Sequence, residues 1–297
     1  MVRGLEKFRE FFRNYNGSYV IIGGTACDIA INEAGLTPRA TKDIDIILIV
    51  EAISPSFVLK FWEFVKEGGY ELKEQGDKDR RYYRFTKPEN HEFPYQVEIF
   101  SKNPDLLDLK ESTYLTPIPV SDGIPSLSAI LLDDDYYKYT IDRSTFNEGL
   151  RIANPESLIC LKAKAFLDLQ RRKENGEDVP EKEIRKHKLD IFRLAALLPA
   201  DANFILPESI KVDLQEFTDF ISKELPDNAI FKEMGLGAID IQTLFDLDPP
   251  LSLYIRAILL SFLSTVWNNC IYASLLPANA PSSHFCIMVL ISDKALL

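Results

Sequence analysis

The spacing of hydrophobic residues divides the chain into an N-terminal part with strand-like and helical segments and a C-terminal part with helical segments alone. In the first part, short apolar runs alternate with segments of helical periodicity. Strands are expected over residues 19–22, 44–50, 70–74, 82–86 and 95–100, and helices over residues 5–15, 25–33 and 55–67. This alternation predicts a sheet flanked by helices.

Periodicity becomes helical after Asn154, which suits an N-cap because Pro155 follows it at the first helical position. Residues 103–125 contain several prolines and are expected to form a connection, whereas residues 130–142 suit either a strand or a helix. Helices are expected over residues 154–173, 181–198, 208–224, 238–246 and 251–267. We therefore expect the α+β class, with an α/β domain over residues 1–150 and a helical domain over residues 151–297.

Composition and charge narrow the classes of protein that the chain can represent. Of its 297 residues, 46% are hydrophobic and 27% are charged, which is typical of globular proteins rather than disordered ones. The net charge of −11 does not attract polyanions, so a nucleic acid would need a local basic patch. The four cysteines share no metal-binding spacing and only three histidines are present, which argues against a zinc cluster or a disulfide scaffold.

The two ends of the chain bear on its location. The first residues are charged and amphipathic and lack the apolar core of a signal peptide, so a cytoplasmic protein is expected. Residues 257–292 contain no Asp, Glu, Lys or Arg, but their best candidate for a membrane span, residues 257–276, is interrupted by Asn268 and Asn269. We expect a buried helix or a partner-facing surface here, and no membrane contact.

The first candidate for chemistry is Gly23-Gly24-Thr25, at a predicted strand-to-helix turn. Glycines, which lack a Cβ, let a phosphate approach backbone N–H groups, and a helix N-terminus favours negative charge. Thr25 is expected to cap the helix through its hydroxyl. The turn is therefore a candidate phosphate-binding site.

The second candidate is Asp43-Ile44-Asp45, at the start of the next predicted strand. Because side chains alternate between the faces of a strand, Asp43 and Asp45 are expected on one face and Ile44 in the core. Neighbouring carboxylates repel each other unless a cation lies between them, and hard oxygen ligands beside phosphates are typical of Mg²⁺. Glu98, on a later apolar strand, is the candidate third acid if two metal ions are bound.

These residues together resemble the signature of the polymerase-β-like nucleotidyltransferase superfamily, in which a Gly-Gly-Ser/Thr turn is followed by Asp-x-Asp and later by a third acid. The context from Pro38 to Asp45 is similar to that of the AbiEii-type abortive-infection toxins. This resemblance implies a nucleotidyltransferase-type mixed sheet flanked by helices, followed by a helical domain that completes the cleft.

The same group has a helical lysine and a later helical aspartate. Residues 158–165, which include Lys162, resemble the first helix, and residues 186–193, which include Asp190, resemble the second. Apolar residues flank Lys162, and a cation on such a face needs an anionic partner, for which a triphosphate is suitable. The resemblance implies that Asp190 orients Lys162 or contacts the nucleotide; an ion pair within its own helix is the alternative.

The resemblance implies an enzyme that moves a nucleoside monophosphate from an NTP to an acceptor hydroxyl. The implied metal is Mg²⁺ in a two-metal site, with Mn²⁺ as a substitute. Catalysis is assigned to Asp43, Asp45, Glu98, Lys162 and Asp190, metal binding to Asp43, Asp45 and Glu98, and nucleotide binding to Gly23, Gly24, Thr25 and Lys162.

The acceptor stays open at this point. The resemblance favours the 3′ end of tRNA or another RNA, while a protein hydroxyl or a small molecule is also permitted. A toxin of a toxin–antitoxin or phage-defence system would have a cognate antitoxin protein as a partner. The alternative to an enzyme is a non-catalytic nucleotide-binding protein, such as the regulatory half of a paired module.

Other charged or polar residues near these motifs have simpler interpretations. Asp28 is expected on a solvated helix face and Lys164 in solvent, and Cys27 is expected to pack behind the site. His187 could titrate near neutral pH, although a structural role is more common for a lone histidine. The basic residues over 171–188 alternate with acids, which is typical of a solvated face, with guidance of an RNA as the alternative.

Overall fold

The computed structural model divides the chain into two compact units, residues 1–262 and 263–297. The residues whose structure is described all belong to the first unit and are 2–72, 82–101, 133–198, 204–223, 226–227 and 229–237. The expected connection over residues 103–125, the helices expected over 238–246 and 251–267, and the uncharged segment 257–292 lie outside them. The domain boundary expected near residue 150 lies inside the first unit and stays a prediction.

Within the described residues, the fold is α+β and is built on a seven-stranded mixed sheet with the order β3-β4-β5-β2-β1-β7-β6. The strands are β1 (Tyr19–Ile22), β2 (Asp43–Leu48), β3 (Glu71–Leu72), β4 (Tyr82–Thr86), β5 (Gln96–Phe100), β6 (Ser144–Asn147) and β7 (Leu150–Ala153). β1 pairs with β7 and β2 pairs with β5 in parallel, and the other neighbours are antiparallel. Four of the predicted strands are confirmed to within two residues at each end. The strand predicted over residues 70–74 is found at Glu71–Leu72, with residues 73–74 outside the described ones, and the hairpin of β6 and β7 has no counterpart among the predictions.

Helices surround this sheet and follow it along the chain. They are α1 (Leu5–Phe12), α2 (Gly23–Glu33), α3 (Pro55–Gly68), α5 (Asp134–Asp142), α6 (Pro155–Glu174), α7 (Glu181–Ala195), α8 (Glu208–Ile221) and α9 (Ala229–Glu233), with a short 3₁₀ helix at Val50–Ala52. The open alternative for residues 130–142 is thus resolved as a helix from Asp134 onward. None of these described helices is long and apolar enough to cross a bilayer.

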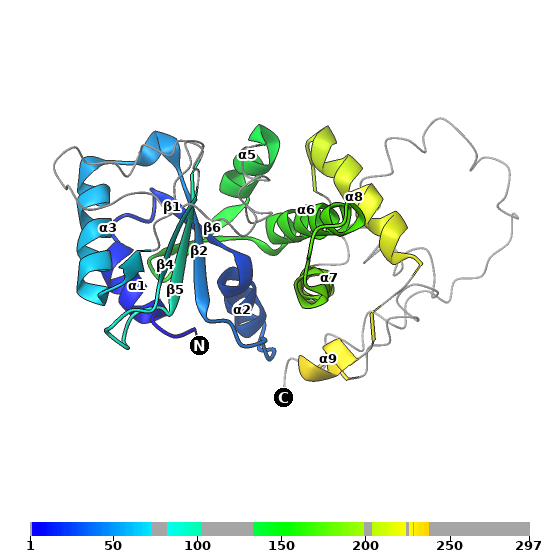
Figure 1. Ribbon diagram of the computed structural model, residues 1–297, viewed down its shortest axis with the longest axis horizontal. Coiled ribbons are helices and arrows are strands. Elements are labelled where there is room, and N and C mark those ends of the chain that lie inside the picture. The colour runs from blue at the N-terminus through cyan, green and yellow to red at the C-terminus, as the bar shows by residue number, and fades with distance from the viewer. Residues whose placement is uncertain are drawn as a thin grey trace, which may run out of the picture. The chain divides into compact units, whose positions relative to one another are not determined.

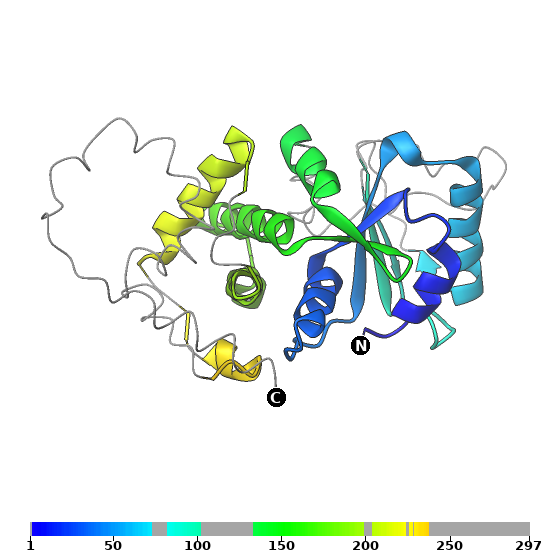
Figure 2. The same cartoon turned by 180° about the vertical axis from the view of Figure 1, so that it is seen from behind.

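The two faces of the sheet carry different helices. α1 and α3 lie on one side and α2 on the other, as both views show (Figure 1, Figure 2). The side of α1 and α3 is an aromatic core, in which the Phe8 ring lies 5.4 Å from that of Tyr19 and 5.8 Å from that of Phe64, both edge-on. Edge-to-face pairs at these centroid distances are favourable for aromatic rings.

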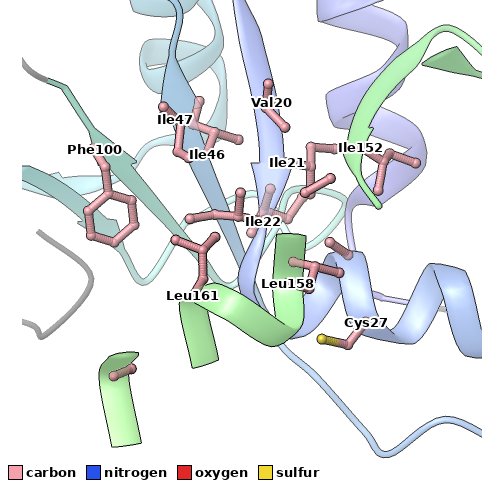
Figure 3. Packing of buried hydrophobic residues seen from close by; sticks show 14 of the residues in the cluster. Val20, Ile21, Ile22, Cys27, Ile46, Ile47, Phe100, Ile152, Leu158 and Leu161 are labelled. Carbon is pink, nitrogen blue, oxygen red and sulfur yellow. The ribbon is translucent and has the colours of Figure 1, made fainter. Parts of the chain in front are cut away.

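The opposite side positions the residues with candidate chemistry. α2 contacts β1, β2, α6 and α7. Leu158 and Leu161 of α6 are buried beside Ile22, the last residue of β1 (Figure 3). Because a buried leucine contributes about 1.5–3 kcal/mol, these contacts hold α6 firmly against the end of β1. The next residue of α6, Lys162, is thereby brought to the start of α2.

Candidate functional site

α2 begins directly at Gly23, so the expected Gly-Gly turn is the first turn of this helix. Gly23 has a φ of 67°, in the left-handed region that favours glycine. A Cβ at Gly23 would lie 1.8 Å from Asp45 Oδ2, and a Cβ at Gly24 would lie 2.9 Å from Thr41 Oγ1 and 3.0 Å from Arg39 Nη2. Glycine at both positions therefore makes room for side chains of residues 39–45.

Thr25 does not cap α2, so that expectation is wrong. The N-cap residue is Ile22, and the Thr25 hydroxyl instead donates a hydrogen bond of 2.5 Å to the backbone carbonyl oxygen of Asp43. Thr25 is fully buried, so this bond replaces hydration of its hydroxyl. It ties α2 to the first residue of β2 and thus fixes where Asp43 lies.

The parallel pairing of β2 with β5 brings the predicted acids together. Asp43 is paired with Gln96 and Asp45 with Glu98. Paired residues of neighbouring strands point to the same side of a sheet, so Asp43, Asp45 and Glu98 share one face. Ile44 is buried on the other face, as predicted.

Asp45 is the acid of this group whose ionised form is least favourable, because like charges lie beside it. Burial, together with the carboxylate of Glu98 and more weakly that of Asp43, raises the pKa of Asp45 to about 7, while the nearby Lys186 opposes this rise. Burial also raises the pKa of Asp43, again with Lys186 as the strongest opposing charge. Within the described residues, Asp45 has no hydrogen-bond donor of its own, so its charge lacks a partner.

Glu98 differs from Asp45 because side chains of the sheet already hold it. Arg84 Nε donates to Glu98 Oε1 at 2.8 Å, and Gln96 Nε2 donates to the same oxygen at 2.7 Å. Glu98 is also largely buried. This charge-assisted contact stabilises the ionised carboxylate next to Asp45.

The donor set of these three residues fits a hard divalent cation in its chemistry. Asp43, Asp45 and Glu98 offer carboxylate oxygens, which Mg²⁺ prefers, and a cation would relieve the repulsion between Asp45 and Glu98. The described residues contain no group of three or more His, Cys, Asp or Glu side chains with the geometry of a metal site. The acids are thus close neighbours on one face, but they do not converge on one point.

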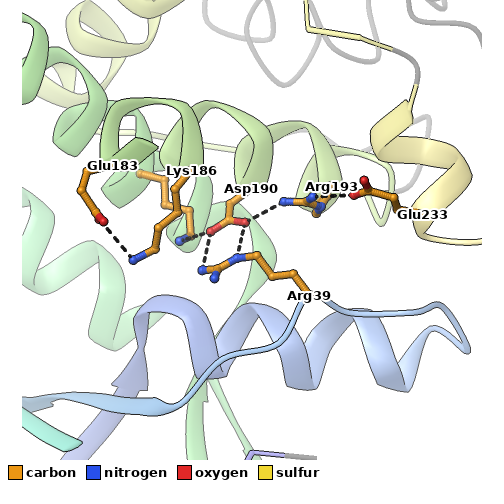
Figure 4. Close-up of polar contacts among 7 residues, drawn as sticks. Arg39, Glu183, Lys186, Asp190, Arg193 and Glu233 are labelled. Atoms are coloured by element: carbon orange, nitrogen blue, oxygen red, sulfur yellow. Dashed lines mark hydrogen bonds and ion pairs between the residues drawn. The ribbon is translucent and has the colours of Figure 1, made fainter. Parts of the chain in front are cut away.

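A second charged cluster centres on Asp190, which is 1% exposed (Figure 4). Arg39 binds it with two hydrogen bonds, Nε to Oδ1 at 2.8 Å and Nη2 to Oδ2 at 3.0 Å. Lys162 Nζ donates to Oδ2 at 2.7 Å and Arg193 Nη1 to Oδ1 at 3.2 Å. Arg193 also reaches Glu233 of α9 at 3.3 Å. Asp190 therefore joins α7 to α6 and to the segment before β2, and Arg193 joins α7 to α9.

The pKa values in this cluster follow from the same contacts. Burial acts to raise the pKa of Asp190, but the charges of Lys162 and Arg39 and their hydrogen bonds hold it well below its usual range. Burial acts to lower the pKa of Lys162, but Cys27 and Asp190 hold it above its usual value. Both residues are therefore ionised at neutral pH. Of the two roles predicted for Asp190, the contacts agree with orienting Lys162.

A small cavity of about 40 Å³ lies among the predicted residues, although Thr25, Asp43, Glu98 and Asp190 do not line it. Its walls are Gly23, Gly24, Asp45, Leu158, Leu161, Lys162, Lys186 and His187. Four of the residues predicted for chemistry, from three separate parts of the sequence, thus meet at one place. The volume is about that of a single water molecule, so any larger ligand requires side chains to move.

Several neighbouring residues differ from the expectations. Asp28 is 7% exposed rather than solvated, and burial raises its pKa to about 6. Lys164 is not free in solvent but binds Asp213 at 2.6 Å. Burial and the charges of Lys162 and Lys186 lower the pKa of His187 well below its usual value, so it does not titrate near neutral pH. Cys27 is buried behind the site as expected, with its pKa raised to about 12 by burial.

The basic residues over 171–188 are mostly neutralised by acids. Ion pairs among the described residues join Arg171 to Glu216, Arg172 to Glu177, Lys173 to Glu181 and Lys186 to Glu183. Lys186 is held only loosely, at 3.6 Å from Glu183. This agrees with a solvated face and gives little support to a basic surface for RNA.

Two residues of the site were missed by the sequence interpretation. Arg39, which appeared only as part of the segment from Pro38 to Asp45, makes a bidentate contact with Asp190. Lys186, which the sequence suggested as part of the helical motif, as an ion-pair partner of Asp190 and as one of the basic residues over 171–188, lines the cavity beside Asp45. It is the strongest charge that opposes the raised pKa values of Asp43 and Asp45. Their partners lie far away in the sequence, and no local pattern indicated either contact.

No protein-family model matches the chain, and no curated protein is significantly similar to it. The resemblance to the polymerase-β-like nucleotidyltransferases, and to the AbiEii-type toxins within them, therefore rests on the residues quoted for it.

Proposed function

We propose that the protein is a metal-dependent nucleotidyltransferase, which transfers a nucleoside monophosphate from an NTP to an acceptor hydroxyl. One observation carries the proposal: the cavity at the start of α2 is lined by Gly23 and Gly24, by the acid Asp45 and by the cations Lys162 and Lys186. Groups suited to a phosphate and to a divalent cation thus lie side by side.

The acids and the lysines of the site would have different roles, the acids in metal binding and the lysines in phosphate neutralisation. Asp43, Asp45 and Glu98 would hold Mg²⁺, or Mn²⁺ in its place. Bound metal supplies neutralisation of phosphate charge and activation of the attacking hydroxyl. Lys186, whose side chain is 42% exposed and loosely paired, would move to contact the triphosphate. Lys162 stays fixed by Asp190 and contributes positive charge from below the glycines.

The acceptor is the open part of the proposal. An RNA 3′ end follows from the resemblance alone, and the same holds for a cytoplasmic toxin–antitoxin or phage-defence role with an antitoxin partner. The helices after β7 would close one side of the cleft and select the acceptor. A protein hydroxyl and a small molecule remain the alternative acceptors. Acids already neutralise the basic residues Arg171, Arg172 and Lys173, which favours these two alternatives over RNA.

A labelled-nucleotide assay tests the proposal. The full chain is incubated with each α-labelled NTP, Mg²⁺ and a cell lysate, and the label is followed into RNA, protein or small molecules. We expect Asp43→Asn and Asp45→Asn each to reduce transfer by about a thousandfold or more, because charge neutralisation dominates phosphoryl-group chemistry. Glu63→Gln is the matched control, an exposed acid on α3 that should leave transfer unchanged. Transfer by Asp45→Asn at the wild-type rate would overturn the proposal.

A second candidate, nucleotide binding without transfer, is favoured by one observation. Glu98 is engaged by Arg84 and Gln96, and the described residues hold no preformed group of three metal ligands. Equilibrium binding separates the two functions: an NTP that binds with Mg²⁺ and depends on Asp45, but never releases pyrophosphate in any lysate, identifies the non-catalytic protein.

A further inference from the structure

Arg84 extends the row of acids that crosses the sheet. The register pairs Asp45 of β2 with Glu98 of β5, and Glu98 in turn with Arg84 of β4. Residues that are directly paired on neighbouring strands lie on the same face of a sheet, so the three side chains follow one another in the order Asp45, Glu98, Arg84. A cation of the chain thus stands at the end of a row of two acids.

The two acids of this row differ in what reaches them. Glu98 Oε1 accepts hydrogen bonds from Arg84 Nε at 2.8 Å and from Gln96 Nε2 at 2.7 Å. The carboxylates of Asp43 and Asp45 receive no hydrogen bond from the described residues, and both residues are half-buried, so a ligand can approach them. Of the three acids assigned to metal binding, Glu98 is therefore the one that already has a cationic partner.

This contact places a positive charge where a metal ion would otherwise gain from Glu98. A guanidinium group at hydrogen-bond distance offsets the charge of a carboxylate, and two cations on one carboxylate repel each other. A divalent cation that binds Glu98 must therefore displace Arg84 or bind against its charge. The same repulsion is absent from the hydrogen bonds of Asp43 and Asp45, because no cation of the described residues is bonded to either of them.

Displacement of Arg84 is sterically simple. Its side chain is 34% exposed, whereas that of Glu98 is 11% exposed. The guanidinium group can therefore turn towards solvent while Glu98 stays in place beside Asp45, held by Gln96. Its charge also acts on Asp43, where it opposes the rise in pKa that burial causes, so Arg84 belongs to the electrostatic surroundings of the whole acidic group.

We propose that Arg84 and a divalent cation compete for Glu98. In the metal-free protein Arg84 is the counter-ion of Glu98, the first divalent cation binds at Asp43 and Asp45, and a second one gains Glu98 only when Arg84 leaves it. The inference rests on the proposed function for the identity of the metal site. It deepens that function by giving the two metal ions an order of binding and by assigning to Arg84 the control of the second one.

Binding of Mn²⁺ to the full chain tests this order without any assay of transfer. Electron paramagnetic resonance of the free ion gives the number of bound ions and the dissociation constant of each. We expect the wild type to bind the first ion at least about tenfold more tightly than the second, and Arg84→Gln to bind the second ion at least about tenfold more tightly than the wild type does. An unchanged second dissociation constant in Arg84→Gln would overturn the role of Arg84.

Two further variants show whether the gain acts through Glu98. When Arg84→Gln is combined with Glu98→Gln, the gain should disappear, because the contested carboxylate is absent. Lys42→Gln is the matched control, since Lys42 is exposed and its charge, like that of Arg84, opposes the raised pKa of Asp43. It should change the second dissociation constant by less than about threefold. An equal gain in Lys42→Gln would show that overall charge sets the affinity, and would overturn the proposal.

The wild-type protein allows a second measurement, which stays valid if Arg84→Gln does not fold. The Nε–H group of Arg84 gives a proton–nitrogen NMR signal, which Arg84→Lys identifies by its absence. During titration with Mg²⁺ this signal should shift only as the second ion binds, and an unchanged signal at saturation would overturn the proposal.

Failure of the inference differs from failure of the proposed function. No binding of Mn²⁺ by the wild type or any variant would contradict the metal-dependent function itself, and the inference with it. Tight binding of one or two ions that Arg84→Gln leaves unchanged would contradict only the competition for Glu98.

Discussion

Asp190 with the cations bound to it, and Asp45 with the acids beside it, form two charge clusters on the same side of the sheet that have opposite electrostatics. Asp190 receives hydrogen bonds from Arg39, Lys162 and Arg193, and its pKa is depressed. Asp45 faces Glu98 across the β2–β5 pairing, and its pKa is raised to about 7. Within the described residues, cations are hydrogen-bonded to the central carboxylate of the first cluster, whereas none is hydrogen-bonded to Asp45 in the second.

This difference separates residues that stabilise the fold from residues that would bind a metal ion according to the proposed function. A buried carboxylate with several cationic partners links helices, and its removal leaves those cations unpaired. A buried carboxylate beside another acid weakens the fold unless something positive binds there. Stability measurements can therefore tell the two clusters apart without any assay of activity.

The largest effect is expected for Asp190→Asn. The substitution leaves the buried Lys162 and the half-buried Arg39 without their charged partner, so the free energy of unfolding should fall by about 3–5 kcal/mol. Chemical denaturation at pH 7 measures this change. Glu216→Gln is the control, because it breaks an ion pair with Arg171 in which both side chains are about half exposed, and it should cost less than about 1 kcal/mol. A similar small loss for Asp190→Asn would show that its network does not stabilise the fold.

Substitution of Gly23 examines the packing of the second cluster. Gly23→Ala places a Cβ 1.8 Å from Asp45 Oδ2 at a φ of 67°, so we expect a loss of about 3 kcal/mol. Gly35→Ala is a matched control with a φ of 72° and nothing within 4 Å of the added Cβ, and should cost about 1 kcal/mol. The difference between the two unfolding free energies measures the clash with Asp45. Equal losses of unfolding free energy in the two variants would mean that the Asp45 side chain moves aside at no cost.

The smallest of the three effects is a gain in stability from Asp45→Asn. The folded pKa of Asp45, about 7, exceeds the value of about 3.9 for an unfolded aspartate, so the folded protein binds the extra proton between these pH values. The free energy of unfolding of the wild type therefore falls as pH rises from 4 to 7. That of Asp45→Asn does not show this decrease, because the variant lacks the titrating carboxyl group. At pH 8 the variant should be more stable by on the order of 2 kcal/mol, and at pH 3.5 it should equal the wild type.

Denaturation midpoints across this pH range measure that gain. Added Mg²⁺ should narrow the gap at pH 8 by stabilising the wild type alone. Stability curves of the wild type and Asp45→Asn that run in parallel from pH 4 to 8 would contradict the raised pKa.

Much of the fold could be predicted because its signals are local. β1, β4 and α3 agree with their predicted bounds to within a residue, since each is a continuous apolar or periodic run between turn residues. The hairpin of β6 and β7 was missed for the opposite reason. Its strands are only four residues long, and its turn places Glu148 at a φ of 46°, which a non-glycine residue rarely adopts.

The candidate site could be predicted only in part. The side of the sheet on which Asp43, Asp45 and Glu98 lie follows from strand alternation, and the structure agrees. The partners of Asp190 could not be foreseen, because Arg39 lies on a segment far away in the sequence and contacts Asp190 only after α7 docks. The burial of Asp28 was missed for a similar reason: the segment that covers it comes after the helix that carries it.

The register of β2 against β5 has a consequence for the order of folding. β1, α2 and β2 are consecutive along the chain and can pair while Glu98 is still distant, so the Glu98 carboxylate does not contribute to the raised pKa of Asp45 at that stage. Repulsion from Glu98 arises only when β5 docks in parallel beside β2, a step that closes a long loop and that we therefore expect to come late. Magnesium ions present during refolding should therefore speed this step, so that the cation acts on how fast the sheet closes as well as on how firmly it stays closed.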